Sequence, residues 1–301
     1  MEEGGGDVPE GNGGVVRALW RMLEFLHSMV YYAPERPEVY ASLGFKGGWM
    51  GYFATRSAAL GQVPPPVITA CFYGFAPRMV ERALPDAWTY ATPTQAIAAR
   101  YEVFHRASTR LLGRDVDRWA NKVLAEKLVA AVADVPPFGS PMFAAHGSLE
   151  CPPSAHLKLF WAAAALREYR GDAHIAALRL AGVEPVESHV LMAALGLVPN
   201  DQRKYRGWTE EEWAAGVASL SERGWLDATG DVTREGHRRR SLIERDTDRL
   251  SALAWAERDD TWMADTVNQL GPLVGQMVTG GAVPFPNGMG VAPVPELAVP
   301  R

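Results

Sequence analysis

The sequence predicts a mainly α-helical protein made of two helical halves. Apolar residues recur at helical spacing through most of the chain, and prolines or capping residues stand where many of these runs begin. Residues 135–141 are rich in proline and glycine and separate the runs into two sets. With 301 residues the chain is longer than most single domains, which favours two units or a duplicated one.

The N-terminal half is expected to be helical from about residue 15 to residue 135. Its apolar residues recur at positions that share one face of a helix. Thr92 before Pro93 is the clearest helix start, because the threonine hydroxyl can cap the helix and proline suits its first position. The predicted spans are residues 15–29, 47–60, 64–71, 77–84, 92–112 and 115–134.

The C-terminal half continues the helical pattern. Gly171, Gly182 and Gly196 are interpreted as breaks or ends of helices. Thr209 precedes three glutamates, as expected of a capping residue followed by an acidic first turn. The predicted spans are residues 156–170, 172–181, 185–195, 209–224 and 233–253.

A small β-hairpin wing is predicted near residues 225–233, between the last two of these helices. Residues 225–226 and 231–233 flank the turn at 228–230. Helix, hairpin, helix is the order of a winged-helix unit. A short sequence similarity between Ala59-Leu60-Gly61 and Ala194-Leu195-Gly196 suggests that both halves are winged-helix-like and arose by duplication. The alternative is that the similarity is due to chance.

These patterns divide the chain into five segments. The first 14 residues are rich in glycine and are expected to be disordered. The expected segments after that are an aromatic-rich helical domain at 15–135, a linker at 136–153, a winged-helix-like domain at 154–270 and a tail rich in glycine and proline at 271–301.

The composition disfavours several classes of protein. The sequence shows no run of about 18 apolar residues that could span a membrane, and no secretory signal. Cys71 and Cys151 lie far apart, which argues against a disulfide framework or a cysteine zinc site. The formal net charge of -5 gives no general attraction to nucleic acid. A cytoplasmic protein without a membrane partner is expected.

Several short motifs occur together along the chain. They are His27 with Tyr31 and Tyr32, Tyr52-Phe53-Ala54-Thr55-Arg56, Arg170-Gly171-Asp172-Ala173-His174 and Gly207-Trp208-Thr209-Glu210-Glu211-Glu212-Trp213. In this combination the chain resembles a group of actinobacterial proteins described as helix-turn-helix-like, over about residues 17–290. The resemblance implies an all-helical fold derived from the winged helix, without a settled activity. The C-terminal unit alone is similar to MarR-type regulators.

Charge argues against a DNA-reading helix in this unit. Such a helix needs basic or neutral polar side chains toward bases and phosphates, whereas the candidate begins with Glu210, Glu211 and Glu212. The predicted wing adds Asp227 and Asp231. DNA is therefore disfavoured as a partner. An arginine cluster follows the wing. If it binds DNA, the alternative function is a ligand-responsive transcriptional regulator; otherwise the cluster is only a solvent-exposed helix face. Its members are Arg234, Arg238, Arg239 and Arg240.

Residues 166–174 place charged groups and a histidine around Gly171, between two apolar runs. His174 is a candidate for acid and base catalysis, and Asp172 beside it could set its protonation state. Arg167 or Arg170 could bind an anionic ligand. The structural alternative is that Asp172 caps a helix and the arginines form ordinary ion pairs.

His27 is a second candidate acid or base, since it stands on an apolar helix with Tyr31 and Glu35 at helical spacing. Glu35 could orient its imidazole. A hydrogen-bonded core histidine is the alternative. Aromatic residues concentrate in this half and could line an apolar pocket rather than simply fill a core. The candidate ligand-binding residues are Tyr31, Tyr32, Trp49, Tyr52, Arg56 and Tyr73, together with Arg167 and Arg170.

The expected function is binding of a small organic molecule in a pocket between the two halves. In the leading version it is an enzyme, of the kind found in bacterial specialised metabolism, in which His27 and His174 transfer protons. No cofactor is predicted, and no HxxxH or HExxH motif is present. A haem or metal held by His27 and His174 is a second alternative. A structural or partner-binding protein and a homodimer also stay open.

Overall fold

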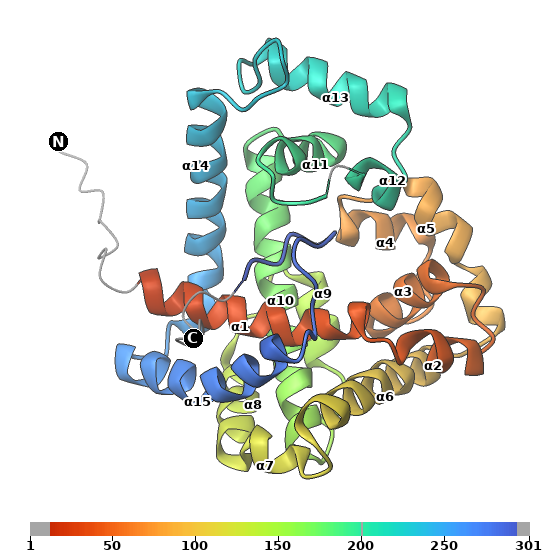
Figure 1. Ribbon diagram of the computed structural model, residues 1–301, viewed down its shortest axis with the longest axis vertical. Coiled ribbons are helices and arrows are strands. Elements are labelled where there is room, and N and C mark those ends of the chain that lie inside the picture. The colour runs from red at the N-terminus through yellow and green to blue at the C-terminus, as the bar shows by residue number, and fades with distance from the viewer. Residues whose placement is uncertain (1–12, 200, 294–301) are drawn as a thin grey trace.

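The computed structural model describes residues 13–199 and 201–293, and its regular elements are helices (Figure 1). The predicted mainly α class is confirmed. The elements up to residue 147 are α1 Gly13–Tyr32, α2 Arg36–Ser42, α3 Gly48–Ser57, α4 Pro65–Phe72, α5 Pro77–Ala83, α6 Pro93–Leu112, α7 Val116–Ala120, α8 Lys122–Asp134 and α9 Pro141–Gly147, with 3-10 turns at Ala58–Leu60 and Asp86–Thr89. The later elements are α10 Ala155–Leu180, α11 Pro185–Ala194, α12 Gln202–Arg206, α13 Glu210–Glu222, α14 Arg234–Ser251 and α15 Asp260–Thr279, with a 3-10 turn at Ala252–Trp255.

Capping side chains start several helices where the sequence predicts them. The Thr92 hydroxyl accepts a hydrogen bond from the backbone N–H of Gln95, whose side chain accepts in turn from the N–H of Thr92. Thr209 and Glu212 form the same capping box at α13. Thr233 caps α14. Each cap satisfies N–H groups that the first turn of a helix leaves unpaired.

The predicted helix break at Gly171 is wrong, because α10 is one continuous helix of 26 residues. A glycine inside a helix costs about 1 kcal/mol relative to alanine. Packing offsets that cost here, since α10 contacts α1, α8, α9 and α14. The predicted helix at 115–134 is in turn divided at Asn121, whose φ of 44° interrupts it and whose side chain accepts from the N–H of Val123 to cap α8.

The wing is smaller than the predicted hairpin. Among the described residues, β pairing consists of one antiparallel bridge between Leu226 and Val232. Asp227 closes the turn by accepting hydrogen bonds from the N–H groups of Thr229 and Asp231. The described part of the N-terminal half has helices and no such bridge. The winged-helix order is therefore seen in the C-terminal half of the described chain.

The buried apolar side chains form two clusters, and α10 contributes to both. The larger cluster packs α1, α3, α6, α8 and α15 around the first part of α10, which runs through the middle of the molecule (Figure 1). The smaller cluster joins the end of α10 to α11, α13 and α14, and we call residues 177–243 the winged-helix lobe. Residues 136–153, predicted as a linker, contain α9, which packs on α10, and residues 271–279 of the predicted tail belong to α15.

Beyond α15 the chain runs back across α1 to α12 (Figure 1). We call residues 284–293 the strap. The carbonyl of Gly288 accepts hydrogen bonds from Gln202 at 2.9 Å and from Arg206 at 2.6 Å, both in α12. Gly290 approaches α11 so closely that a Cβ there would lie 2.6 Å from Cε of Met192. The strap thus joins the winged-helix lobe to α1. None of the described helices is long and apolar enough to cross a membrane.

Candidate functional site

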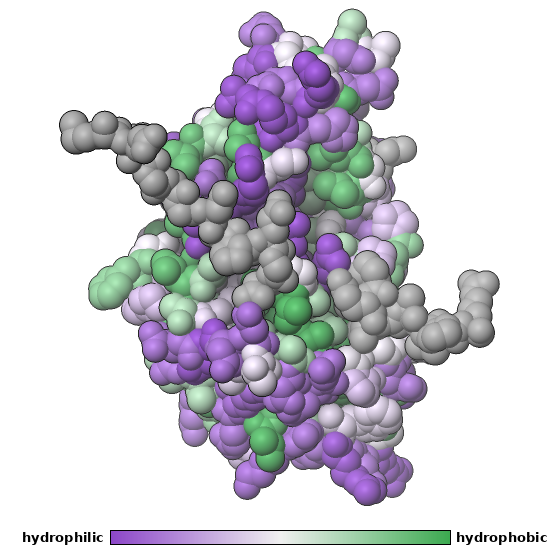
Figure 2. Space-filling model, turned by 90° about the vertical axis from the view of Figure 1, so that its left-hand side faces the viewer, coloured by the Kyte–Doolittle hydropathy of each residue, from purple (hydrophilic) through white to green (hydrophobic). Residues whose placement is uncertain are grey.

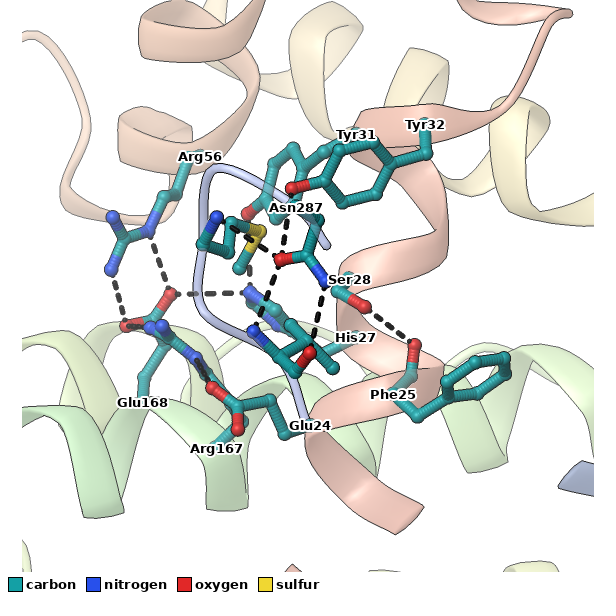
Figure 3. Close-up of polar contacts among 12 residues, drawn as sticks. Glu24, Phe25, His27, Ser28, Tyr31, Tyr32, Arg56, Arg167, Glu168 and Asn287 are labelled. Atoms are coloured by element: carbon teal, nitrogen blue, oxygen red, sulfur yellow. Dashed lines mark hydrogen bonds and ion pairs between the residues drawn. The ribbon is translucent and has the colours of Figure 1, made fainter. Parts of the chain in front are cut away.

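A buried polar centre lies where α1, α3 and α10 meet (Figure 3). Glu168 of α10 accepts hydrogen bonds from Nε and Nη2 of Arg56, at 3.0 and 2.9 Å. His27 lies beside them, with its Nε2 3.8 Å from Oε1 of Glu168 and 3.1 Å from the Tyr31 hydroxyl. We call His27, Arg56 and Glu168 the buried centre, since they are only 0%, 8% and 1% exposed.

Burial and mutual contact fix the charges of this centre. Burial alone would raise the pKa of Glu168, but the Arg56 and Arg167 guanidiniums hold it well below its ordinary value, so the carboxylate is ionised. Burial lowers the pKa of His27 well below its ordinary value, and Arg100 lowers it further, so the imidazole is neutral. Because Nη2 of Arg100 donates to Nδ1 of His27 at 3.4 Å, we assign the ring proton to Nε2.

Positive charge exceeds negative charge around the buried centre. Arg167 bonds Glu168 at 3.1 Å and lies 3.9 Å from Glu24, whose pKa is raised chiefly by burial. Arg100 and Arg206 instead contact aromatic rings and neutral acceptors, and no ion pair joins either of them to a described carboxylate. Arginine stays protonated even when buried. Two guanidinium charges near the centre therefore lack a compensating anion within the described chain.

Arg206 reaches this region from the end of α12. Its Nη2 donates to Gly288 of the strap, its Cζ lies 4.4 Å from the centroid of the Phe75 ring, and its buried Nε has no acceptor among the described residues. Burial lowers the pKa of Arg206, and Arg56 and Arg167 lower it further, while the phenol groups of two nearby tyrosines oppose this. The guanidinium is therefore costly to keep charged in this environment.

The strap passes over the buried centre, and Figure 3 shows its Asn287 facing the Tyr32 hydroxyl. Asn287 is 3% exposed and holds the strap in a closed turn, because its Oδ1 accepts from the N–H of Val291 and its Nδ2 donates to the carbonyl of the same residue. Tyr32 donates to Asn287 at 3.4 Å, and burial raises the pKa of this tyrosine to about 12. The centre is therefore covered by a segment that these polar contacts and the packing of Met289 against the larger core hold in place.

The structure brings several predicted site residues together here. Tyr31 contacts His27, and Nη1 of Arg56 donates to the Tyr52 hydroxyl at 3.1 Å. The ring of Trp49 packs edge-on against Tyr52, with centroids 5.6 Å apart. Arg167 and Tyr32 lie at the edges of the same region. These side chains come from three separate helices, α1, α3 and α10.

His174 and Arg170 lie on the face of α10 that packs against α14. Nδ1 of His174 is 2.9 Å from the Thr247 hydroxyl, which donates to the backbone, so the imidazole is the donor in this contact. Arg170 bonds Glu244 at 3.3 Å and Ser251 at 3.1 Å. Burial lowers the pKa of His174 to about 4, and Glu244 opposes that shift. His27 and His174 thus contact different sets of helices.

Glu35 does not orient His27, and that prediction is wrong. Helix α1 ends at Tyr32, so Glu35 is not on the same helix as His27, and its carboxylate pairs with Arg110 of α6 instead. Tyr73 also lies elsewhere: its hydroxyl donates to the carbonyl of Val183 at the edge of the winged-helix lobe.

Asp172 is not the cap of its own helix, because α10 is continuous there. Its Oδ2 accepts hydrogen bonds from the N–H groups of Met142 and Phe143, both at 3.0 Å, and so caps the start of α9 from a neighbouring helix. Burial raises the pKa of Asp172 to about 7, although these two N–H groups oppose the shift. The role of this carboxyl shown by the structure is to hold α9 against α10.

Four residues of this region were not among the predicted site residues: Arg100, Glu168, Arg206 and Asn287. Two of them could have been recognised from the sequence pattern, because they are charged residues on an otherwise apolar helix face. Arg100 lies in the buried stripe of α6 formed by alanines, a valine and a phenylalanine, and Glu168 similarly interrupts the buried stripe of α10. A charge on an apolar face marks a buried polar contact. Arg206 and Asn287 carried no such signal, because they reach the centre through tertiary packing.

Two hollows lie outside the buried centre. A narrow cavity of about 10 Å³ lies behind His27, between α3, α6, α9 and α10. A wider surface depression of about 680 Å³ is bounded by the α6–α7 connection and α15. Among residues 13–199 and 201–293, no group of three or more histidine, cysteine, aspartate or glutamate side chains could hold a metal ion.

The winged-helix lobe exposes charge of both signs. Glu212 of α13 pairs with Arg78 of α5, and Glu210 pairs with Arg203 of α12. The outer side of α13 otherwise presents alanines and acidic residues. Figure 2 shows mainly hydrophilic side chains over the end of the molecule where α13 and the start of α14 lie. α13 therefore presents no basic surface of its own.

Comparison with known proteins supports the helical architecture. The model of a family described as the Helix-turn-helix family matches residues 16–284, which include the larger core, the buried centre and the winged-helix lobe. Comparison with curated proteins and with solved structures gives no match. Since the family match spans most of the chain, the protein belongs to the Helix-turn-helix family.

Proposed function

We propose that this protein binds a small organic anion beside Arg206, beneath the strap. The observation that carries the proposal is the half-buried guanidinium of Arg206, whose Nε is buried without an acceptor and which lacks a carboxylate partner among the described residues. An isolated buried charge is strongly unfavourable unless something compensates it. A ligand carboxylate would remove this penalty and would use the Nε that has no acceptor in the described chain.

The surroundings favour a carboxylate with an apolar body. Arginine binds carboxylates through two parallel hydrogen bonds, which fixes their orientation. The Phe75 ring lies against Arg206, and Tyr52 and Phe72 pack next to Phe75 with ring centroids 5.5 and 6.5 Å away. These rings would contact the apolar part of the ligand, and the Tyr32 hydroxyl could add a polar contact.

Entry of such a ligand requires the strap to move. Arg206 now donates to the carbonyl of Gly288, and Asn287 lies over the buried centre (Figure 3). The strap is anchored to α12 and α1 by hydrogen bonds, and its Met289 packs against the larger core. Binding would therefore exchange a backbone contact of Arg206 for a stronger contact with a charged carboxylate.

The experiment compares benzoate with its neutral analogue benzyl alcohol, using the thermal unfolding midpoint of the full chain. Benzoate is expected to raise the midpoint saturably, because a ligand that binds only the folded state stabilises it. Benzyl alcohol should not do so. Arg206→Gln should abolish the response, whereas Arg203→Gln, on the same helix but paired with Glu210, should keep it. Equal responses to both compounds, or a response retained in Arg206→Gln, would contradict the proposal.

Of the two histidines predicted to act on a ligand, we propose that His27 alone acts on this anion. Its neutral imidazole lies within the buried centre, whereas His174 contacts α14. Because Nδ1 already accepts from Arg100, we propose that the Nε2–H of His27 donates a hydrogen bond that polarises a carbonyl group of the bound anion. Exchange of a labelled proton from a bound carbonyl acid, lost in His27→Gln, would support the enzyme form; ligand binding without such exchange would favour a binding protein.

DNA binding is the second candidate, and one observation besides the family favours it. Four arginines, at spacings of four, seven and four residues, line the exposed face of α14. They are Arg234, Arg238, Arg245 and Arg249. This stripe overlaps only in part with the arginine cluster expected from the sequence, since Arg239 and Arg240 lie outside it. Within the stripe, Arg238 pairs with Glu235 and Arg249 with Asp246.

The DNA candidate predicts retention on duplex DNA at low salt that weakens steeply as salt rises. Changing Arg234 and Arg245 together to alanine should reduce both affinity and the salt slope, because two phosphate contacts would be lost. Arg118→Ala, an exposed arginine on α7, is the matched control. Failure to bind DNA even at low salt would exclude this function.

A further inference from the structure

The narrow cavity behind His27 has an unusual lining. It lies among Thr55 of α3, Arg100 of α6, His146 of α9 and Trp161 of α10, and the rest of its lining is mainly apolar. Its volume is about 10 Å³. That is room for about one water molecule and too little for a carboxylate or a phosphate, and a halide, which is larger than water, would enter only with a small shift of the lining side chains. Arg206 does not line it, so this cavity is separate from the ligand site proposed above.

Hydrogen-bond donors on the cavity wall lack acceptors. Nε and Nη1 of Arg100 and Nε1 of Trp161 are buried, and none has a partner among the described residues. The two side chains are only 4% and 6% exposed. Buried polar groups in folded proteins are nearly always satisfied, so three donors beside one cavity point to an occupant that accepts hydrogen bonds.

The charge of Arg100 adds a second argument. Its remaining nitrogen, Nη2, contacts the neutral Nδ1 edge of His27, while its Cζ lies 5.0 and 5.5 Å from the ring centroids of Tyr31 and Phe160. Aromatic faces stabilise a cation only in part. No described carboxylate pairs with this guanidinium, so an occupant with a negative charge would be favoured over a neutral one.

We propose that this cavity is a binding site for a monatomic anion, a halide such as chloride. Arg100 and Trp161 would donate N–H groups to the ion, and the guanidinium would balance its charge. A halide accepts hydrogen bonds from several directions and donates none, which matches the unpaired donors of Arg100 and Trp161. Its binding would rigidify the contact between α6 and α10 behind the buried centre.

His146 is the feature of the wall that would suit water instead. Its Nδ1 donates to the carbonyl of Met142 at 2.9 Å, and burial lowers its pKa to about 4, so the ring is neutral and its Nε2 is an acceptor. A water molecule could donate to this nitrogen, whereas a halide could not. The experiment must therefore distinguish a halide from water.

Crystals of the full chain grown or soaked in sodium bromide provide that distinction, because bromide scatters anomalously and water does not. The proposal expects an anomalous peak in the cavity within hydrogen-bond distance of Arg100 and Trp161. In solution, replacing sodium nitrate by sodium bromide at constant ionic strength should raise the unfolding midpoint saturably. A cavity without an anomalous peak would hold water only, and would overturn the proposal.

Variants separate this site from general salt effects. Arg100→Gln should lose the bromide-specific rise, and Arg106→Gln, an exposed arginine on the same helix paired with Glu102, should keep it. Trp161→Phe keeps most of the ring volume and removes one donor, so it should weaken bromide binding by about tenfold. Trp161→Phe also tests the site if the Arg100→Gln variant does not fold. An undiminished bromide response in Arg100→Gln, or in Trp161→Phe, would overturn the proposal.

Discussion

Glu168 shows how strongly a single buried residue determines this fold. Its carboxylate is 1% exposed and accepts hydrogen bonds from Arg56 and Arg167. Removing one partner of such a group leaves the other charges buried without compensation. Because the surplus of positive charge at the centre would grow, loss of this carboxylate should be far more damaging than loss of an exposed one.

Glu168→Gln is therefore expected to lower the free energy of unfolding by about 3–5 kcal/mol. Urea unfolding followed by circular dichroism measures this change. Glu235→Gln, which removes two exposed ion pairs on α14, is the control and should have little effect. A similarly small effect of Glu168→Gln would show that the buried centre does not stabilise the fold.

Asp172 gives a pH-dependent prediction. Burial raises its pKa to about 7, above the ordinary value of 3.8 that it has in the unfolded chain. The folded state therefore binds more protons than the unfolded state between about pH 4 and 7, and its stability falls as pH rises through this window. Asp172→Asn retains an acceptor for the two N–H groups of α9 but removes this dependence.

The unfolding free energy of the wild type minus that of Asp172→Asn should fall by about 2–3 kcal/mol between pH 5 and pH 8. Urea unfolding at both pH values measures it, and subtraction removes the contributions of other groups. The exposed Asp86→Asn variant should give a difference that does not vary. A constant difference for Asp172→Asn would mean that its carboxyl stays ionised throughout.

Residue patterns could predict part of the buried centre and not the rest. His27, Tyr31, Tyr52 and Arg56 were predictable because they belong to motifs on apolar helices. Arg206 was not, because α12 is a five-residue helix whose position depends on the strap and on α5. Local periodicity carries no information about which distant helix a side chain will meet.

At the scale of elements, α10 organises the molecule because it is continuous. It passes through the larger core and ends in the winged-helix lobe, so its two parts share one axis (Figure 1). The sequence predicted two helices here because Gly171 stands among charged residues, a pattern typical of a break. The tertiary contacts of α10 on several sides outweigh that local preference.

Gly171→Ala tests this continuity directly. In a continuous helix alanine is favoured over glycine, so the free energy of unfolding should rise by about 0.5–1 kcal/mol. The added Cβ would lie 3.3 Å from the flexible end of Arg167, which can shift slightly. Gly207→Ala is a contrasting control that should destabilise, since Gly207 has a φ of 76° and its Cβ would meet Met79 at 2.2 Å. A loss of stability in Gly171→Ala would indicate a broken helix.

Capped helices were the most predictable elements. Thr92, Thr209 and Thr233 mark starts that the structure reproduces, because a cap depends on residues within one turn. The division at Asn121 was missed, since it rests on one residue in an unusual backbone conformation. The wing was overestimated because β-prone residues beside a turn do not by themselves form a ladder.

At the scale of the whole molecule, the strap connects the buried centre with the winged-helix lobe. It contacts Tyr32 of α1 through Asn287 and Arg206 of α12 through Gly288. A ligand that displaced the strap would therefore change contacts on both sides. The sequence predicted a tail that wraps or trails, but the partners of that tail could be learned only from the folded chain.

If Arg206 binds a ligand as we propose, the free protein retains this residue at a cost in stability. Arg206→Met keeps much of the volume and removes the unbalanced charge, and the direct measurement is its urea unfolding against the wild type, both dialysed free of organic anions. We expect the variant to be more stable by about 1–4 kcal/mol and to show no response to benzoate. A loss of several kcal/mol would contradict it, because Arg206 would then be a structural anchor of the strap.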